Sequence, residues 1–363
     1  MATAIPLRSG EAFSTTMAEL QRWLGVDSRT DGDAVVSGLT SDSRLLRSGD
    51  CFVALNGEQF DGHHYLGAAQ AAGAVVAVVE RIDSSLSLPQ LLVEDSRVAL
   101  GAIASGWRNR SDATVVAITG SNGKTTVKEM VAAILRRVGE TVATTGNLNN
   151  DIGVPYTLLQ LTPSTRYAVV EMGANRPGDI EPLTRMARPA VALVNGVAPA
   201  HLEGFGSLAC IAMTKGEIFN GLEPGGTAIF VDDPTFFSLW QEMAADYPQI
   251  IFGLGEQADY RALYQSSQSG VTVDVITATE RETIRSPLLG DHNVHNLLAA
   301  VAIARTLEIS WDEIRSGLAA MAVVPGRLQL RHAREDLGEI AVLDDSYNAN
   351  PASLEAGLKV LQS

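Results

Sequence analysis

The sequence is poor in the residues that mark disulfide-rich, zinc-binding and nucleic-acid-binding proteins. Only two cysteines, Cys51 and Cys210, occur in 363 residues, and they lie far apart without a Cys-x-x-Cys pattern. A disulfide framework or a zinc site is therefore not expected, and both thiols are predicted to be reduced. Lysine and arginine total 27 against 42 aspartates and glutamates, which gives a formal net charge of −15. This balance argues against a nucleic-acid partner, which requires clustered basic side chains.

Long hydrophobic runs are also missing. No apolar stretch is long enough to span a bilayer, and the first twenty residues mix Pro6, Arg8 and Glu11 with hydroxyl side chains, unlike a secretory signal. We therefore expect a cytoplasmic protein without membrane insertion. Hydrophobic residues still make up 46% of the chain, which allows large cores. The length predicts about two to three domains of roughly 150 residues each.

The strongest functional signal is the segment Gly120-Ser121-Asn122-Gly123-Lys124-Thr125-Thr126. It lies between a β-branched stretch at 114–118 and a helical pattern of apolar residues that begins at Val127. Glycines let several backbone N–H groups point at one anion, and the helix N-terminus adds favourable partial charge. Lys124 can then reach the outer phosphates while Thr125 faces Mg²⁺. The segment predicts a nucleoside triphosphate site.

This glycine loop is the shortened form Gly-x-x-Gly-Lys-Thr, because Ile118 stands where the eight-residue form has its first glycine. Six letters of this kind also occur in ordinary turns before helices. The strand before the loop and the amphipathic helix after it favour the phosphate site. The missing first glycine and the lack of an Asn-Lys-x-Asp run argue against a P-loop motor or a signalling GTPase.

The strand and helix patterns predict an α/β fold in three parts. These are a small N-terminal α/β domain over 1–110, a central domain with a mostly parallel sheet over 111–326, and the beginning of a C-terminal domain over 327–363. A single βα unit cannot bury its own faces, so we expect the third part to be incomplete. The expected strands are 51–55, 74–79, 90–93, 114–118, 167–170, 190–194, 227–231 and 340–343, and the expected helical stretches are 64–72, 211–219 and 296–321.

Three polar residues of the central part are candidates for chemistry. Glu171 follows the expected strand 167–170, at the edge where open parallel sheets bind ligands, and its carboxylate could hold Mg²⁺. Taken one at a time, each candidate also has an ordinary interpretation. Glu171 could be a solvated strand end, His201 a loop histidine, and Lys215 a lysine on a solvated helix face.

Taken in order, the motifs resemble the Mur ligase family over nearly the whole chain. Within that family, the last motif of the chain, which begins at Asp344, resembles the branch that adds D-alanyl-D-alanine. Ser41-Asp42-Ser43-Arg44 and Asp61-Gly62-His63 resemble the same branch. Besides the glycine loop, the resemblance rests on Gly146-Asn147-Leu148-Asn149-Asn150-Asp151-Ile152-Gly153-Val154-Pro155, Glu171-Met172-Gly173-Ala174, His201-Leu202-Glu203-Gly204-Phe205-Gly206, Lys215-Gly216-Glu217, His292-Asn293-Val294-His295-Asn296, Pro325-Gly326-Arg327 and Asp344-Asp345-Ser346-Tyr347-Asn348-Ala349-Asn350-Pro351.

The resemblance implies a three-domain ligase that forms an amide bond at the expense of ATP, in the cytoplasmic stage of peptidoglycan assembly. The terminal carboxylate of UDP-N-acetylmuramoyl-tripeptide would attack the γ-phosphate of ATP. The amine of D-alanyl-D-alanine would then displace the phosphate of the resulting acyl phosphate. We expect a monomer. With its third part incomplete, we expect this chain to bind nucleotide and UDP-linked peptide but to ligate poorly.

The resemblance also implies roles for individual residues. Lys124, His201 and Lys215 would serve catalysis, and two Mg²⁺ ions are expected. Thr125 and Glu171 would bind one ion, while His201 and a carbamylated Lys215 would support the other. The ATP site would comprise Gly120, Ser121, Asn122, Gly123, Lys124, Thr125 and Thr126, with Asn293 and Asn296 near adenine and Arg327 and Asp345 at the γ-phosphate and ribose. The UDP-linked substrate would contact Ser43, Arg44, Asn147, Asn149 and Asn150.

Alternatives remain open for several of these assignments. Asn293 or Asp291 could serve as a helix N-cap, and residues 147–150 could form a polar turn. Within the family, the ligase that adds the third amino acid to UDP-N-acetylmuramoyl-dipeptide shares the Ser-Asp-Ser-Arg type of first domain. The final motif argues against that ligase, which typically has a histidine-containing motif there. A non-catalytic nucleotide-binding fragment would be expected to lack Lys124 or Glu171, and both are present.

Overall fold

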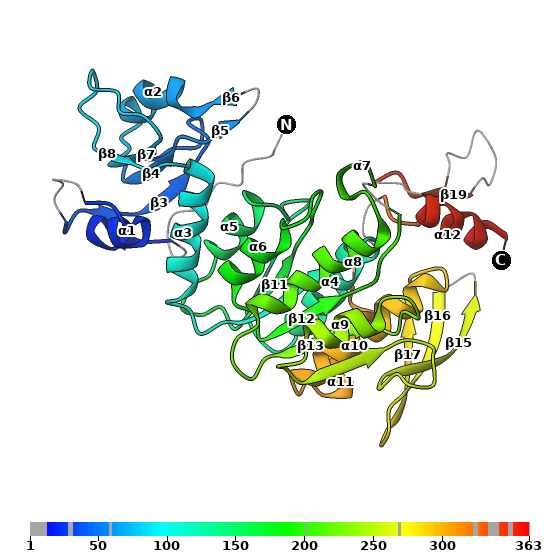
Figure 1. Cartoon of the computed structure of the whole chain (residues 1–363). Coiled ribbons are helices and arrows are strands. Elements are labelled where there is room, and N and C mark those ends of the chain that lie inside the picture. The colour runs from blue at the N-terminus through cyan, green and yellow to red at the C-terminus, as the bar shows by residue number, and fades with distance from the viewer. Residues whose placement is uncertain are drawn as a thin grey trace. The chain divides into compact units, whose positions relative to one another are not determined.

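The computed structural model describes residues 13–27, 32–57, 60–199, 202–267, 270–321, 326–332, 341–347 and 351–362. The chain divides into two compact units (Figure 1). Unit 1 contains the described residues of Met1–Ala113 and Thr145–Thr165, and unit 2 those of Thr114–Thr144 and Arg166–Ser363. The α/β class is confirmed, whereas the domain boundaries at 110 and 326 stay predictions. His201, Pro325, Ile340 and Asn348 to Asn350 lie outside the described residues.

Unit 1 is built on a four-stranded parallel sheet. Its central strands are almost entirely apolar and fully buried, as expected for a parallel sheet that is covered on both faces. The sheet order is β3 (Gly38–Thr40), β4 (Asp50–Val53), β7 (Val76–Val79) and β8 (Gln90–Leu92). The other elements are β1 (Thr15–Thr16), α1 (Met17–Leu24), β2 (Val35–Val36), β5 (Asn56–Gly57), β6 (Phe60–Asp61), η1 (Gly62–Tyr65), α2 (Leu66–Ala71), α3 (Ser96–Arg108) and α5 (Gly153–Leu158).

Unit 2 contains a six-stranded sheet in which every neighbouring pair is parallel. Strand β9, which precedes the glycine loop, lies between β11 and β12. The chain continues from β9 to one side of the sheet and later to the other, so the strand order reverses at β9. Open parallel sheets bind ligands at such a point. The predicted strands of this part are present, but Glu171 is the last residue of its strand rather than the residue after it. The sheet order is β10 (Thr141–Ala143), β11 (Tyr167–Glu171), β9 (Thr114–Thr119), β12 (Val191–Val194), β13 (Thr227–Val231) and β14 (Gln249–Phe252).

The core of unit 2 includes residues of α4, α10, α11 and the sheet. Helix α10 is buried along most of its length, because its run of Leu, Ala, Val and Ile is apolar on nearly all sides. The predicted helical stretch 296–321 is two helices, and the first begins four residues earlier than expected. The helices of the unit are α4 (Lys124–Leu135), α6 (Ile180–Ala187), α7 (Leu202–Phe205), α8 (Leu208–Gly216), η2 (Glu217–Gly221), α9 (Phe237–Met243), α10 (His292–Thr306) and α11 (Trp311–Ala319).

An antiparallel sheet in unit 2 was not predicted from the sequence. It consists of β15 (Arg261–Ser267), β16 (Gly270–Ile276) and β17 (Arg281–Ser286). Val271, Val273 and Val275 alternate toward the core, which is the period of a half-buried strand. The last elements are β18 (Gln329–His332), β19 (Ala341–Asp344) and α12 (Pro351–Gln362), of which β18 and β19 pair antiparallel.

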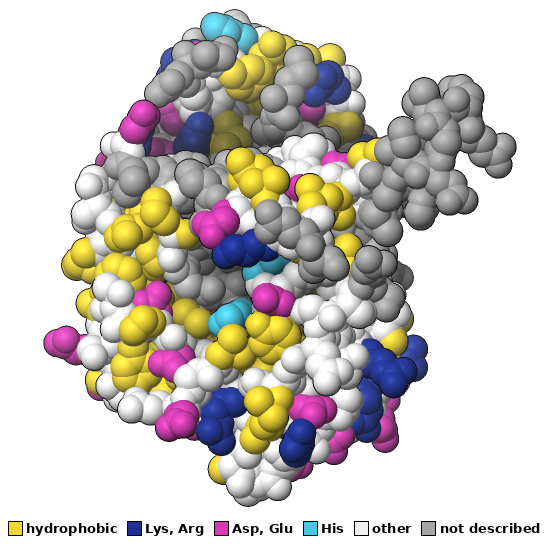
Figure 2. Space-filling model, turned by 90° about the vertical axis from the view of Figure 1, so that its right-hand side faces the viewer, with side chains coloured by type: hydrophobic (Ala, Val, Ile, Leu, Met, Phe, Trp, Pro, Cys, Tyr) yellow, Lys and Arg dark blue, Asp and Glu magenta, His cyan; other side chains and the backbone are white. Residues whose placement is uncertain are grey.

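The described surface mixes charges of both signs. On the face drawn in Figure 2, Lys and Arg side chains lie among Asp and Glu side chains. Ion pairs such as Arg281–Asp274 and Arg315–Glu282 belong to this pattern. Within the described part of the chain, no helix has the length and apolar character needed to traverse a bilayer.

Candidate active site

The glycine loop follows β9 and ends where α4 begins. Gly123 starts the helix with a φ of 77°, a left-handed conformation that favours glycine. A Cβ atom at this position would lie 2.2 Å from Asn296 Oδ1 and 2.4 Å from Asn195 Nδ2, so the site also requires the absence of a side chain. The first amides of α4 have no carbonyl one turn back, so they are available to an anion.

Replacing Gly123 by alanine is expected to weaken nucleotide binding at least tenfold, because the new methyl group must displace both asparagine amides. A tenfold loss corresponds to about 1.4 kcal/mol. Calorimetric titration with a non-hydrolysable ATP analogue measures the effect.

Gly225→Ala is the matched control for this substitution. Gly225 also has a positive φ, 83°, but a Cβ atom there meets nothing within 4 Å. Gly225→Ala therefore introduces backbone strain without a steric clash. Equal losses of nucleotide affinity in the two variants would contradict the role given to Gly123.

Lys124 curls back over the loop. Its Nζ donates to the backbone oxygen of Gly120 at 2.7 Å and to that of Ser121 at 3.3 Å. Burial lowers the pKa of Lys124, and the neighbouring Arg327 acts in the same direction, whereas Glu171 opposes the shift. An anion bound at the loop would therefore stabilise the charged ammonium.

Thr125, Glu171 and Arg327 come together from distant parts of the sequence. The Thr125 hydroxyl donates to Glu171 Oε2 at 2.9 Å, and both residues are buried. The guanidinium of Arg327 donates to Thr125 Oγ1 at 3.0 Å and lies 4.5 Å from the centroid of the Tyr347 ring. The buried Nε of Arg327 has no partner among the described residues, which leaves one donor for an anion.

This oxygen pair fits Mg²⁺ when phosphate oxygens and waters complete the coordination, because Mg²⁺ is commonly held by one or two protein oxygens together with substrate phosphates. Among the described residues, no group of three or more His, Cys, Asp or Glu side chains has an arrangement that could hold a metal ion, so the described residues offer no complete ligand cage there.

A chain of side-chain amides connects α10 to the glycine loop. Asn296 Nδ2 donates to Asn293 Oδ1 at 2.9 Å, and Asn195 Nδ2 donates to Asn296 Oδ1 at 2.9 Å. The same Asn195 nitrogen also donates to the backbone oxygen of Asn122 at 3.1 Å. Asn195 Oδ1 is buried and unpartnered among the described residues. Sequence reasoning missed Asn195, although it follows β12 directly, at the edge where Glu171 was found.

Asn293 does not act as the cap of α10. It lies inside the helix, and its Nδ2 donates to the backbone oxygen of Leu289 at 2.7 Å. The N-cap residue is Asp291, whose side chain makes no capping hydrogen bond and accepts instead from the Ser266 hydroxyl at 2.7 Å. The polar side chains of this helix start therefore do not satisfy its first amides.

Lys215 is buried in α8, and the interpretation of a solvated helical lysine is wrong. Its relative exposure is 3%. Burial lowers the pKa of Lys215 to about 7, and the charge of Lys124 contributes, whereas Asp179, Glu217 and Glu171 act in the opposite direction. A substantial fraction of this amine is therefore neutral, and nucleophilic, near neutral pH.

Glu217, two residues further on, fixes the end of α8 to the start of α6. Its Oε1 accepts from the Gly178 amide at 3.0 Å, and its Oε2 accepts from the amides of Ile180 and Glu181 at 3.2 and 3.1 Å. Burial raises the pKa of this carboxyl group. The Lys-Gly-Glu motif thus combines a buried amine with the contact that holds its helix in place.

The two remaining candidates for the ATP and metal sites are His201 and Asp345. His201 lies outside the described residues, so the structure gives no position for it. Asp345 Oδ1 accepts from the Leu328 amide at 3.2 Å, next to Arg327 in the sequence. In this arrangement Asp345 supports the segment that carries Arg327.

The candidates for the UDP-linked substrate all lie in unit 1. Arg44 is highly exposed and forms a two-bond ion pair with Asp42, at 2.8 and 2.5 Å. Asn150 Oδ1 accepts from the amides of Ile152 and Gly153 at the start of α5. This is the structural role expected if residues 147–150 form a polar turn. The remaining three candidates are the half-buried Ser43 and Asn149 and the exposed Asn147.

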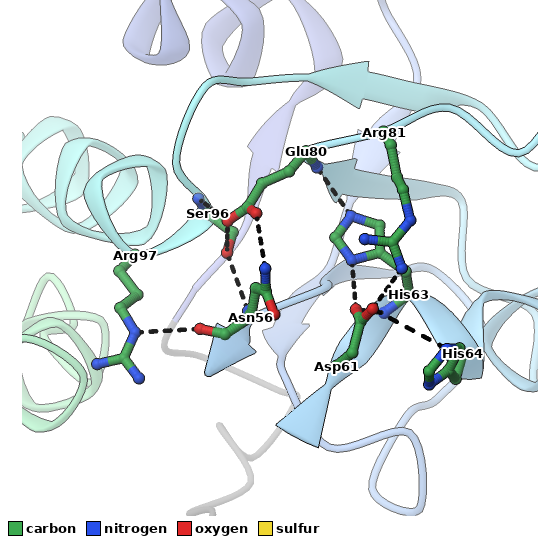
Figure 3. Close-up of polar contacts among 8 residues, drawn as sticks. All are labelled: Asn56, Asp61, His63, His64, Glu80, Arg81, Ser96 and Arg97. Atoms are coloured by element: carbon green, nitrogen blue, oxygen red, sulfur yellow. Dashed lines mark hydrogen bonds and ion pairs between the residues drawn. The ribbon is translucent and has the colours of Figure 1, made fainter. Parts of the chain in front are cut away.

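The Asp61-Gly62-His63 motif forms a structural network in unit 1 (Figure 3). His63 is buried, and its Nδ1 lies 2.7 Å from Asp61 Oδ1, while its Nε2 accepts from the Glu80 amide at 2.9 Å. The ring proton therefore lies on Nδ1. Arg81 also donates to Asp61 and is the main cause that holds the pKa of that carboxyl well below its usual range. Both ring nitrogens of His63 are thus engaged.

The fold and the geometry of unit 2 define a P-loop type of nucleotide-binding enzyme. Sequence models of protein families refine this class: the Mur ligase middle domain matches residues 118–304, and the Mur ligase family, catalytic domain, matches residues 35–133. The chain belongs to the Mur ligase family.

Individual relatives agree with this assignment. The UDP-N-acetylmuramoyl-tripeptide--D-alanyl-D-alanine ligase of Escherichia coli is 44% identical over 352 residues, which are 96% of this chain and 76% of that enzyme. A crystal structure of MurF from Acinetobacter baumannii has 35% identity and a TM-score of 0.90, covering 97% of this chain and 77% of that one. The MurF ligase of Thermotoga maritima in complex with ADP has 31% identity and a TM-score of 0.80, with coverages of 89% and 74%.

Proposed function

We propose that this chain is an ATP-dependent ligase that joins D-alanyl-D-alanine to UDP-N-acetylmuramoyl-tripeptide, forming the pentapeptide precursor of peptidoglycan. The observation that carries the proposal is the 44% identity to a ligase of that name over 96% of the chain. The geometry of unit 2 agrees with it, because the loop lysine, the Thr125–Glu171 pair and Arg327 meet at one end of the parallel sheet.

The reaction must bring two anions together, so the site needs cations and oriented donors more than a nucleophilic side chain. The substrate carboxylate attacks the γ-phosphorus of ATP, and ADP leaves. The amine of the dipeptide then attacks the acyl carbon, loses a proton and expels phosphate. Lys124, the loop amides and Arg327 are proposed to hold the phosphates during both steps. Asn293, Asn296 and Asp345 are proposed to contact the nucleoside.

Thr125 and Glu171 are proposed to hold one Mg²⁺ ion, with His201 and Lys215 supporting a second. Bound there, Mg²⁺ would neutralise charge on the phosphate oxygens and favour the approach of the carboxylate. The Glu171 carboxylate is fixed for this task by the Thr125 hydroxyl, so little reorganisation is needed when the metal and the nucleotide arrive.

We further propose that Lys215 is carbamylated. Its neutral amine would add to CO₂, forming an N–C bond and releasing one proton, which converts a neutral amine into an anionic carbamate. Starting from the ammonium form, a second proton is released. The lowered pKa of about 7 supplies the neutral amine at neutral pH. Placed near the charge of Lys124, the carbamate would replace a repulsion by an attraction.

In unit 1, Ser43, Arg44, Asn147, Asn149 and Asn150 are proposed to contact the UDP-linked peptide. We propose a cytoplasmic enzyme, because ATP and UDP-linked precursors are cytoplasmic metabolites. We also propose a monomer, since the residues assigned to the nucleotide all come from one chain.

Binding of UDP-N-acetylmuramoyl-tripeptide is expected to be at least tenfold tighter than binding of the corresponding dipeptide, in the presence of Mg²⁺ and a non-hydrolysable ATP analogue. Calorimetry measures both affinities. The tripeptide is preferred because the acyl group to be activated is its terminal carboxylate. A dipeptide preference would instead assign the chain to the preceding ligase, which adds the third amino acid.

A further inference from the structure

Lys128 is a buried lysine that the proposed reaction does not use. It lies in α4, one turn after Lys124, and its relative exposure is 1%. Its Nζ donates to the backbone oxygen of Thr144 at 2.7 Å and pairs with Glu129 Oε1 at 2.8 Å. Burying a charged amine is costly unless it is hydrogen-bonded and paired, so these two contacts are what make the buried position of Lys128 tolerable.

The partner, Thr144, lies where β10 separates from β11. Its amide still donates to the Val169 oxygen at 3.0 Å, as in a parallel ladder. The next ladder bond should join the Glu171 amide to the Thr144 carbonyl. Instead, the Glu171 amide donates to the Thr144 hydroxyl oxygen at 3.0 Å, which frees the carbonyl for Lys128. The side chain of Thr144 thus replaces its own backbone oxygen in the ladder.

These contacts close a ring around the Thr125–Glu171 pair. Lys128 donates to the backbone oxygen of Thr144, and the Thr144 hydroxyl accepts from the backbone amide of Glu171. The Glu171 carboxylate accepts from the hydroxyl of Thr125, which lies one turn before Lys128 on the same helix. Thr144 and Glu171 are each 2% exposed. In such a setting, water cannot easily replace a lost hydrogen bond, so each link constrains the next.

We propose that Lys128 and Thr144 are positioning residues that hold the Glu171 carboxylate at the Thr125 hydroxyl for Mg²⁺. The inference rests on the proposed function of that pair. Both act through Glu171, by fixing the backbone at the last residue of β11. Groups that orient a metal ligand in this way typically change metal affinity by about 10- to 100-fold when removed.

The test is the Mg²⁺ dependence of nucleotide binding, measured by titrating Mg²⁺ at a fixed concentration of a fluorescent ATP analogue. Thr144→Val keeps the shape and removes the ladder acceptor, and Lys128→Met keeps the length and removes the donor. Each is expected to raise the half-saturating Mg²⁺ concentration by about tenfold or more. Thr144→Ser keeps the hydroxyl and is expected to restore the parent value.

Thr184→Val is the matched control, because Thr184 is equally buried and its hydroxyl donates to the backbone oxygen of Ile218 at 2.7 Å, a contact outside the proposed metal pair. It is expected to lower thermal stability without changing the Mg²⁺ requirement. If Lys128→Met does not fold, the comparison of Thr144→Val with Thr144→Ser still tests the inference. A parent-like Mg²⁺ requirement in Thr144→Val would overturn the inference. A parent chain whose nucleotide binding ignores Mg²⁺ would overturn the metal site itself, and this inference with it.

Discussion

Replacing Lys124 by methionine is expected to weaken binding of a non-hydrolysable ATP analogue by about 100-fold or more. Removing one partner of a desolvated charge pair costs about 2–5 kcal/mol, because the other charge is left without compensation. Lys124 occupies such a position: it is half-buried against the loop, its Nζ is held by the Gly120 and Ser121 carbonyls, and burial lowers its pKa. Methionine retains most of the volume, so the loop should keep its shape.

Calorimetry with and without Mg²⁺ measures this loss. The matched control is Lys359→Met, because Lys359 lies on α12 with a side chain that is 71% exposed and an ion pair to Glu355. That control is expected to bind the analogue as the parent does. Parent-like affinity in Lys124→Met would show that the ammonium does not contact the phosphates and would remove the central residue from the proposed site.

In CO₂-free buffer, the free energy of unfolding of the parent is expected to rise between pH 7 and pH 9 relative to that of Lys215→Met. The folded-state pKa of Lys215 is about 7, well below the value near 10.4 of an exposed lysine. Above the unfolded-state pKa neither state carries the charge. As the pH falls toward 7, only the unfolded chain takes up the proton, so the parent loses stability by up to about 1.4 kcal/mol per pH unit.

Urea unfolding of both proteins at pH 7, 8 and 9 measures the difference, and Lys359→Met is expected to follow the parent at every pH. Adding bicarbonate at pH 8 is expected to stabilise the parent but not Lys215→Met, because only the parent can form the carbamate. Parallel pH profiles would contradict the lowered pKa. A bicarbonate effect of equal size in both proteins would contradict carbamylation at Lys215 while leaving the pKa untouched.

Local patterns made much of unit 2 predictable. The β-branched run at 114–118, the glycine loop and the helix after it are adjacent in sequence, so periodicity and turn chemistry are sufficient to place them. The same approach located the strands that it predicted in this unit within a few residues, but it did not predict β10, β14 or β18. It missed the antiparallel sheet of β15 to β17, although the alternation of Val271, Val273 and Val275 was available as a signal.

The rest of the site depends on contacts between distant segments. The lowered pKa of Lys215 is set by its burial against other elements and by the nearby charge of Lys124, and no pattern within α8 encodes it. Arg327 reaches Thr125 across 202 positions of the chain. Asn195 is different, because the strand-end rule that selected Glu171 would also have selected it. Thr144 could not be found in this way, since its role follows from a departure in the β10–β11 ladder.

The chain of amides from Asn293 through Asn296 and Asn195 has a thermodynamic consequence. Asn195 Nδ2 is shared between the side chain of Asn296 and the backbone of the loop at Asn122, so neither contact can shift alone. The two halves of a nucleotide should therefore bind cooperatively: occupancy of the base side by adenosine should raise the affinity of the loop for pyrophosphate, and pyrophosphate should raise the affinity for adenosine by the same factor. Binding of the correct base would then raise the affinity of the loop for the phosphates, where the chemistry takes place.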